Sequence, residues 1–351
     1  MDSSAIDCTS PGEIRFESGP AFETALTSAP NADEAARSAA RARQDQLTKP
    51  PGALGRLEDL AVWLAGWQGT VEPRVAHVQA VVFAGNHGVT AQGVSPYPVE
   101  VTAQMVANFQ AGGAAINAMA EAFGYRLTVV PLDLDRPTRD FTTGPAMSEA
   151  ETLHALNAGA AALTHDGDVI VLGEMGIGNT TVASALAAAV FGGAGRDWAG
   201  PGTGLDAHGV SRKADVIDAA LALHRDHCHG PFETLRRLGG RELAAIAGAV
   251  TAARLRRIPV VLDGAVATAA VALLCGANSQ ALAHCVAGHV SAEPAHRRLL
   301  DLIGLRPLLD LEMRLGEGTG AAMAVQILKA AAATHANMAT FTEADVSGRD
   351  D

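Results

Sequence analysis

Aromatic side chains, cysteines and basic residues are all scarce in this sequence, and the shortage of basic charge excludes one class of partner. Phe, Trp and Tyr make up 4% of the 351 residues, and 26 Lys and Arg face 38 Asp and Glu, for a net charge of −12. Proteins that bind nucleic acid need clustered Lys and Arg for the phosphate backbone. We therefore expect no nucleic-acid partner, whereas a small anionic substrate needs only a few local donors.

The four cysteines show no CxxC spacing, and the N-terminus is polar and acidic. These features predict reduced thiols and no signal peptide, which would begin with basic residues and continue with an apolar run. The longest apolar run, residues 265–277, is too short to span a bilayer. We expect a cytoplasmic protein that does not associate with membranes.

Recognisable metal-binding motifs are also missing. The segment HRDHCH (224–229) places two histidines three residues apart near a predicted helix end, which would permit a zinc site. Neither HExxH nor CxxC accompanies it, so a solvated helix end is the better interpretation. We expect no metal ion and no other cofactor.

Short apolar, β-rich segments alternate with helical patterns from residue 75 onward, which predicts a doubly wound α/β fold with a mostly parallel sheet. The strand segments are 78–85, 126–135, 168–181 and 258–265. Helices are expected at about 101–122, 148–164, 181–190, 212–225, 241–255 and 265–275. Such sheets bind ligands beyond the carboxyl ends of their strands. The residues there are Gly85-Asn86-His87-Gly88, Asp133, Gly173-Glu174 and Asp263-Gly264.

The two ends of the chain differ from its centre in composition and in predicted structure. Residues 1–30 are rich in Ser, Pro and acidic residues and predict a disordered tail. A smaller helical domain is expected from residues 31–74, beginning with Asn31 as an N-cap, together with residues 320–341. The large Rossmann-like domain would then span 75–319, and 342–351 would be a frayed tail.

Two glycine-rich loops offer sites for a phosphate. In VLGEMGIGNTT a strand segment is followed by Gly176 and Gly178 and then by a helical pattern, whose first N–H groups would hold an anion. A tight turn with a threonine cap is the alternative interpretation. The second loop, GPGTG (200–204), precedes Lys213, which either neutralises a phosphate or is a solvated helix lysine.

Two further segments carry polar side chains suited to a ligand. Asp263 ends an apolar strand segment beside a glycine, where it would accept ribose hydroxyls or cap the next helix. The segment GHVSAEPAHRR gathers His289, Ser291, Glu293 and His296. A nucleophilic triad is rejected, because such close neighbours rarely face one another and no GxSxG elbow is present. A phosphate-binding Ser291 is the better interpretation.

Glu317 lies between two glycines in RLGEGTGAAM, directly before an alanine-rich helical pattern. Glycine allows a tight turn and lets a flat ligand lie close to the backbone. Together with Glu174 and Asp263, this carboxylate suits a reaction at a sugar phosphate. Glycosyl transfer passes through an oxocarbenium-like state, and carboxylates stabilise its positive charge or move a proton.

Ten motifs in order extend this interpretation to nearly the whole chain. They are KPPGALGRLE (49–58), FAGNHGV (83–89), GVSPYPVEVTAQM (93–105), GPAMS (144–148), GEMGIGNTT (173–181), GTGLD (202–206) with Lys213, GG-E (239–242), IPVVLDG (258–264), SAEP (291–294) and RLGEGTGAA (314–322). With these motifs, residues 33 to 341 resemble the nicotinate-nucleotide–dimethylbenzimidazole phosphoribosyltransferase family.

The resemblance implies a homodimeric enzyme that moves the ribosyl 5-phosphate of nicotinate mononucleotide to 5,6-dimethylbenzimidazole. The products would be α-ribazole 5-phosphate and nicotinate, with inversion at the anomeric carbon. It implies catalytic roles for Glu317, as general base, and for Glu174 and Asp263. Phosphate and ribose would bind at Gly176, Gly178, Asn179, Thr180, Gly202, Thr203, Gly204, Lys213 and Ser291. The base pocket would include His87, Ser95, Met105, Met175 and Leu315.

Four positions depart from the family pattern. Asn86, Pro201, Ala265 and Ala295 stand where aspartate, arginine, phenylalanine and glycine are common. The acceptor base therefore stays open, and transfer to another benzimidazole, a purine or a phenol is an alternative. A non-catalytic nucleotide-binding protein is a second alternative. A transferase that uses phosphoribosyl pyrophosphate would need magnesium and paired acidic residues, whereas Asp263 is followed by glycine.

Overall fold

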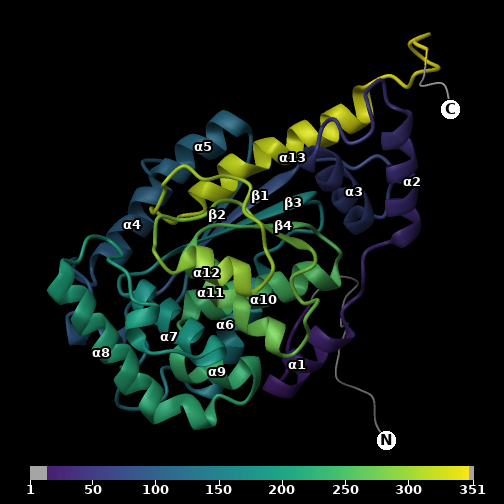
Figure 1. The fold of residues 1–351 in the computed structure, drawn as a ribbon. Coiled ribbons are helices and arrows are strands. Elements are labelled where there is room, and N and C mark those ends of the chain that lie inside the picture. The colour runs from purple at the N-terminus through teal and green to yellow at the C-terminus, as the bar shows by residue number, and fades with distance from the viewer. Residues whose placement is uncertain (1–13, 348–351) are drawn as a thin grey trace, which may run out of the picture.

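The computed structural model describes residues 14–347, and their five strands form one sheet in which all neighbours are parallel (Figure 1). The strand order is β2-β1-β3-β4-β5. The strands are β1 (Val78–Ala84), β2 (Arg126–Pro131), β3 (Val169–Met175), β4 (Val260–Leu262) and β5 (Cys285–Ala287). The chain leaves β1 toward one edge and later returns to its other side. The topological switch point, where such sheets bind ligands, therefore lies between β1 and β3.

Helices cover both faces of this sheet (Figure 1). On one face lie α10 (Arg241–Leu255) and α11 (Ala265–Ala272), with α1 (Gly19–Ser28), α6 (Glu149–Ala161), α7 (Asn179–Phe191) and α9 (Gly230–Leu238) packed around them. On the other lie α3 (Arg56–Gln68), α4 (Val101–Gln110), α5 (Ala115–Phe123) and α13 (Thr319–Asn337). The remaining α-helices are α2 (Glu34–Gln46), which packs on α3, α8 (Ala207–His224) and α12 (His296–Leu302). Short 3₁₀ turns occur at Gly88–Gln92, Gly195–Asp197, Arg225–His227 and Leu273–Gly276.

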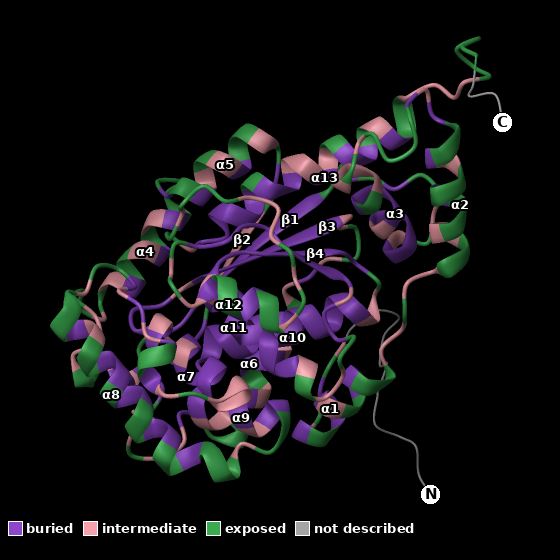
Figure 2. Cartoon of the chain, in the orientation of Figure 1, coloured by how far each residue is buried: buried purple, intermediate pink, exposed green. Residues whose placement is uncertain are grey.

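Each face of the sheet has its own apolar core, because successive strand residues point to opposite sides. Val81 and Phe83 of β1 join the cluster under α10 and α11, whereas Val82 joins the cluster under α5 and α13. Every residue of β1 is buried, as Figure 2 shows for the central strands. Burying each large apolar side chain contributes roughly 1.5–3 kcal/mol. The carboxyl ends of β1 and β3 are therefore held in a rigid frame.

The predicted α/β fold is confirmed, with corrections to individual elements. The expected helix over 101–122 is two helices, because Gly112 takes a φ of +80° and ends α4. The strand segments 126–135 and 168–181 contain shorter strands that end at Pro131 and Met175. The sequence patterns missed α9, α12 and β5. A three-residue strand such as β5 is too short to show a period.

The prediction of a disordered tail over residues 1–30 is wrong for its described part. Helix α1 begins after Ser18, whose side chain accepts a hydrogen bond from the N–H of Ala21. Phe22 and Leu26 of this helix are buried in the core under α10. These few apolar residues override the polar composition, because they cover core that would otherwise be exposed. Residues 1–13 lie outside the described range.

The predicted N-cap Asn31 is also wrong. Asp33 caps α2 and accepts from the N–H of Ala36, whereas the side-chain oxygen of Asn31 accepts from Arg254. At the start of α6, Ser148 and Glu151 form a capping box in which each side chain accepts the other residue's backbone N–H.

The segments 31–74 and 320–341 meet where α3 packs against α13. Helix α13 also contacts β3 and β4, so part of the proposed smaller domain shares the core of the sheet. The division into domains stays a prediction. Residues 342–347 of the predicted C-terminal tail are exposed, and 348–351 lie outside the described range. No helix within residues 14–347 is both long and apolar enough to cross a membrane.

Candidate active site

A cleft lies beyond the carboxyl ends of β3 and β4. Its walls are the glycine loop after β3, the start of α7, the turn before α8, the start of α11 and two loops that follow β5. The lining residues are Glu174, Met175, Gly176, Ile177, Asn179, Thr180, Gly202, Thr203, Gly264, Ala265, Val266, His289, Ser291, Glu293, Arg314, Leu315 and Gly316. Nine of these were predicted as site residues: Glu174, Met175, Gly176, Asn179, Thr180, Gly202, Thr203, Ser291 and Leu315.

Glu174 is a buried carboxylate near the end of β3. Its side chain accepts a hydrogen bond from the amide of Asn179, in the first turn of α7. Burial raises its pKa to about 8, and the negative charges of Asp263, Glu242 and Glu317 add to the rise. A pKa raised in this way favours the protonated form of Glu174 in the free protein at neutral pH. A cation arriving beside this carboxyl group would favour the loss of that proton.

Glu317 occupies a tight turn between β5 and α13. Its φ is +63°, and Gly316 and Gly318 on either side have φ values of +82° and +85°. Strain of this kind in a non-glycine residue costs about 1–2 kcal/mol and often marks a functional site. The turn places the N–H of Glu317 3.2 Å from the carbonyl oxygen of Glu174. The backbones that carry the two carboxylates are thus tied together.

The Glu317 side chain is buried but incompletely paired. It is 4% exposed, and its Oε2 has no hydrogen-bond partner within the described residues. Burial raises the pKa of this carboxyl group, a backbone hydrogen bond from Ile116 at the start of α5 opposes the rise, and Asp263 adds to it. A carboxylate with one free oxygen and a raised pKa is suited to accept a proton.

Asp263 is hydrogen-bonded to the backbone directly after Glu317. Its two carboxylate oxygens accept from the N–H of Ala321 at 2.9 Å and of Gly318 at 3.2 Å, at the start of α13. His289 Nε2 lies 3.7 Å from Oδ1. Burial raises the pKa of Asp263, and His289 and the backbone donors oppose that rise. Asp263, Glu317 and Lys213 all lie behind the residues that line the cleft. The two backbone contacts of Asp263 at the start of α13 favour a positioning role for it.

Lys213 of α8 reaches the opposite wall of the cleft. Its Nζ donates to Thr180 Oγ1 at 3.0 Å and to the carbonyl oxygen of Gly200 at 2.9 Å. The side chain is 1% exposed, so the alternative of a solvated helix lysine is wrong. Burial lowers the pKa of Lys213 to about 8, and the negative charge of Glu293 opposes this. The lysine, the threonine and the first turn of α7 form a site suited to an anion.

The turn before α8 is tied to the loop before Glu317. Gly202 and Gly204 have left-handed φ values of +55° and +125°. Arg314 Nη1 donates to the carbonyl oxygen of Gly202 at 3.1 Å. Arg314 was not predicted as a site residue, although it begins the motif around Glu317. A cation three residues before that carboxylate was the available signal.

His87 does not line the cleft. The side chain is 1% exposed, and its Nε2 lies 2.5 Å from Oε1 of Glu242, which is fully buried at the start of α10. The predicted place of His87 in a base pocket is therefore corrected to a buried position beneath the glycine loop. Sequence analysis also missed Glu242 as a site residue, because its partner lies 155 positions away.

Of the other predicted base-pocket residues, Met175 and Leu315 line the cleft, whereas Ser95 and Met105 do not. Met105 and Met175 are half-buried and pack against the apolar cluster under α5 and α13, and Met175 lines the cleft. Leu315 is 59% exposed at the rim. The hydroxyl oxygen of Ser95 accepts a backbone N–H two residues further on. Helix α4 touches the glycine loop directly, since Thr102 Oγ1 accepts from the N–H of Ile177.

Ser291 lies in the cleft wall, and it does not form a triad with its neighbours. The N–H of Ser291 donates to His296 Nδ1 at 2.8 Å, while the other ring nitrogen lies 3.0 Å from Thr268 Oγ1. Burial lowers the pKa of His296 to about 3, so the ring stays neutral. The Ser291 hydroxyl oxygen accepts from the N–H of Glu293. Glu293 also lines the cleft and was not predicted as a ligand-binding residue.

Two of the departures from the family pattern lie near this wall. Ala265 lines both the cleft and a small neighbouring cavity, and Ala295 lines that cavity too, together with Trp198 and Leu299. Asn86 lies elsewhere and donates to the carbonyl oxygen of Leu134.

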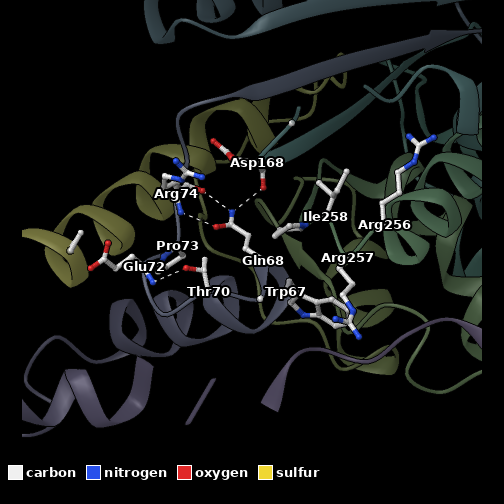
Figure 3. A pocket seen from close by; sticks show the side chains of 14 residues that line it. Trp67, Gln68, Thr70, Glu72, Pro73, Arg74, Asp168, Arg256, Arg257 and Ile258 are labelled. Carbon is white, nitrogen blue, oxygen red and sulfur yellow. Dashed lines mark hydrogen bonds between the residues drawn. The ribbon is translucent and has the colours of Figure 1, made fainter. Parts of the chain in front are cut away.

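A larger hollow lies at the opposite, amino-terminal edge of the sheet (Figure 3). It has a volume of about 710 Å³, and Arg74, Arg256 and Arg257 line it. Figure 3 shows these three side chains pointing in different directions, so they do not converge on one ligand. Gln68 Nε2 instead donates to the carbonyl oxygens of Arg74 and Asp168. Despite its size, this hollow lacks the convergent polar groups of a catalytic site.

Within residues 14–347, no group of three or more His, Cys, Asp and Glu side chains is arranged to hold a metal ion. The histidine-rich segment 224–229 is included in that range. His224 is buried, and its Nε2 lies 2.8 Å from the carbonyl oxygen of Phe141.

Known proteins resemble this chain over nearly its full length. A family model described as phosphoribosyltransferase matches residues 29–346. The nicotinate-nucleotide–dimethylbenzimidazole phosphoribosyltransferase of Novosphingobium aromaticivorans is 59% identical, with 95% of this chain and 98% of the relative covered. That of Rhodobacter capsulatus is 57% identical, with 91% and 95% covered. The crystal structure of CobT from Thermus thermophilus is 42% identical, with a TM-score of 0.84 over 90% of this chain and 100% of that one.

Proposed function

Since this chain belongs to the nicotinate-nucleotide–dimethylbenzimidazole phosphoribosyltransferase family, we propose that the cleft beyond β3 and β4 performs that transfer with Glu317 as its general base. The enzyme moves the ribosyl phosphate of nicotinate nucleotide to dimethylbenzimidazole. The bond between ribose C1′ and the nicotinate nitrogen breaks, and its electron pair neutralises the pyridinium ring. A nitrogen of dimethylbenzimidazole bonds to C1′ from the opposite face, which inverts the anomeric centre.

The observation that carries this assignment is the free, buried Oε2 of Glu317. As the azole nitrogen bonds to C1′, positive charge builds on the ring and its other N–H becomes acidic. Glu317 takes that proton. Its raised pKa makes it a stronger base than a solvated glutamate. The departing nicotinate needs no proton, because its nitrogen already carries positive charge.

The opposite wall would hold the phosphate. Lys213, Thr180 and the N–H groups of the glycine loop at Gly176 and Gly178 offer a cation, a hydroxyl and a helix N-terminus within one region. Ser291 offers a second hydroxyl on the same side of the cleft. Phosphate there would place the ribose between this wall and the Glu317 turn.

Glu174 would stabilise the positive charge that develops on the ribose. Its raised pKa favours the protonated form in the free protein, and the pyridinium of the bound nucleotide would favour the ionised form. The resulting carboxylate would face the oxocarbenium-like transition state.

The test uses pure protein with nicotinate mononucleotide and dimethylbenzimidazole, and both products are followed by liquid chromatography–mass spectrometry. We expect α-ribazole phosphate and nicotinate to appear in equal amounts. Glu317→Gln should bind the nucleotide normally and lower kcat by about 10²-fold or more, the usual scale for a general base.

Glu312→Gln is the matched control. Glu312 lies in the same loop, also has a positive φ of +57°, and is exposed. This variant should retain the parent kcat. If Glu317→Gln turned over as fast as Glu312→Gln, Glu317 would not be the base.

Two further assignments, the oligomeric state and the location, complete the proposal. The exposed apolar side chains of Leu311 and Leu315, in the loop before Glu317, support a homodimer. Light scattering after size-exclusion chromatography would report twice the monomer mass. Cys228, Cys275 and Cys285 are free thiols, which supports a cytoplasmic location.

A further inference from the structure

We propose that the buried His87–Glu242 pair positions the glycine loop and Glu174 for the transfer without touching either substrate. The inference rests on the function proposed above and assigns it two additional positioning residues. The pair lies at the switch point of the sheet, where His87 follows β1 and Glu242 begins α10.

The two side chains of the pair lie close together and are shielded from solvent. His87 Nε2 and Glu242 Oε1 are 2.5 Å apart, which is a short hydrogen bond between a ring nitrogen and a carboxyl oxygen. Both side chains are buried. His87 Nδ1 and Glu242 Oε2 have no hydrogen-bond partner within residues 14–347. A purely structural contact at this place would be served as well by apolar side chains, because polar groups left unpaired in a core are costly. Retaining them points to a use.

Three glycines allow the backbone to pack closely against the His87 and Glu242 side chains. A Cβ on Gly176 would lie 2.9 Å from Glu242 Oε1 and 3.0 Å from His87 Nε2. A Cβ on Gly85 would overlap the Glu242 carboxylate, and one on Gly240 would overlap the His87 ring. The N–H of Gly85 also donates to the carbonyl oxygen of Met175. The pair therefore supports the glycine loop by direct contact at Gly176, which lies two residues after Glu174.

The pair also acts on Glu174 through charge. Three carboxyl groups face Glu174 from the neighbouring elements: Asp263 from the end of β4, Glu317 from the turn before α13, and Glu242 from α10. His87 faces Glu242 from the end of β1. The negative charge of Glu242 raises the pKa of Glu174. Removing this charge while retaining the shape of the side chain should make Glu174 ionise at lower pH.

The experiment compares the pH profiles of kcat for the parent, Glu174→Gln and Glu242→Gln. The rise or fall of kcat with pH that is present in the parent and absent in Glu174→Gln is assigned to Glu174, and this part of the profile is called the Glu174 limb. In Glu242→Gln this limb should move to lower pH by roughly half a unit or more. Its kcat should fall by roughly tenfold, as for other outer hydrogen-bond partners of a reactive group. The KM for nicotinate mononucleotide should change less.

Glu151→Gln is the matched control. Glu151 pairs with Arg241, the residue before Glu242, at 2.5 Å, but it lies on α6 and does not act on Glu174. The same substitution there should lower the melting temperature and leave the pH limb in place. His87→Gln supplies an amide donor to Glu242 and should lower kcat while the limb stays, which keeps the proposal testable if Glu242→Gln does not fold.

An unchanged kcat and an unmoved limb in a folded Glu242→Gln would overturn the positioning role. So would an unchanged kcat in His87→Gln. If Glu174→Gln instead retained the parent kcat and pH profile, the role of Glu174 in the proposed function would fail. A lowered kcat in Glu242→Gln would then still support positioning of the glycine loop.

Discussion

Replacing Asp263 with Asn should loosen the turn that carries Glu317. Asp263 gives one oxygen to the N–H of Ala321 and the other to the N–H of Gly318. Asparagine has one carbonyl oxygen, so one of these N–H groups would face an NH₂ group. Losing a hydrogen bond to a charged acceptor costs about 1.5–3 kcal/mol. Losing negative charge at the start of α13 costs about 0.3–1 kcal/mol more.

Two terms therefore destabilise the variant, and one opposes them. Asp263 is buried, and its raised pKa shows that its charge is costly there. Neutralising the side chain relieves part of that cost. We expect a net loss of about 2 kcal/mol, which lowers the melting temperature of a chain of this size by a few degrees. Because Gly318 directly follows Glu317, kcat should fall while the KM for nicotinate mononucleotide changes little.

Asp168→Asn is the matched control at the other edge of the sheet. Asp168 also accepts two backbone N–H groups, from Ala76 at 2.9 Å and His77 at 2.8 Å, but both go to the same oxygen. An asparagine carbonyl can retain both. The control should lose less than about 1 kcal/mol of stability and none of its kcat.

Thermal unfolding by circular dichroism and initial rates by liquid chromatography–mass spectrometry measure the two effects. The reasoning is refuted if Asp263→Asn matches Asp168→Asn in both melting temperature and kcat. A loss of stability with full kcat would show that Asp263 holds α13 without holding the Glu317 turn.

Three further predictions follow from the same site. Lys213→Met should raise the KM for nicotinate mononucleotide far more than it lowers kcat. In the parent, kcat/KM should fall as pH rises through about 8, because Lys213 then loses its charge. Initial rates measured over a pH series check both expectations. Gly316→Ala should reduce kcat, because its Cβ would lie 2.5 Å from Glu174 Oε1, whereas Gly304→Ala, with a similar φ of +69° and nothing within 4 Å, should cost only about 1–2 kcal/mol of backbone strain. Glu174 takes up protons more readily when folded, so its contribution to stability falls as pH rises from about 4.5 to about 8. Glu174→Gln should therefore gain stability relative to the parent between pH 5 and pH 9 in urea unfolding, and a constant difference would contradict the raised pKa.

Local patterns in the sequence revealed much of the fold and part of the cleft. Runs of buried β-branched residues identified β1, β3 and β4, because a strand covered on both faces carries apolar side chains at most of its positions. The glycines around Glu317 were equally informative, since positive φ values are needed on both sides of it. Composition misled at α1, where four buried apolar residues sit in a polar segment.

The sequence by itself determined the set of parallel strands, the loops at their carboxyl ends, and the carboxylates and the lysine that lie in or near those loops. These depend on local backbone preference and on burial that recurs with a short period. The tertiary structure alone decided which of them act together. The order β2-β1-β3-β4-β5 brings Asp263 to the N–H of Gly318 and His87 to Glu242. It also buries Lys213 and Glu174, and burial is what moves both pKa values to about 8. Desolvation and partner choice depend on neighbours that are distant along the chain, so no local pattern encodes them.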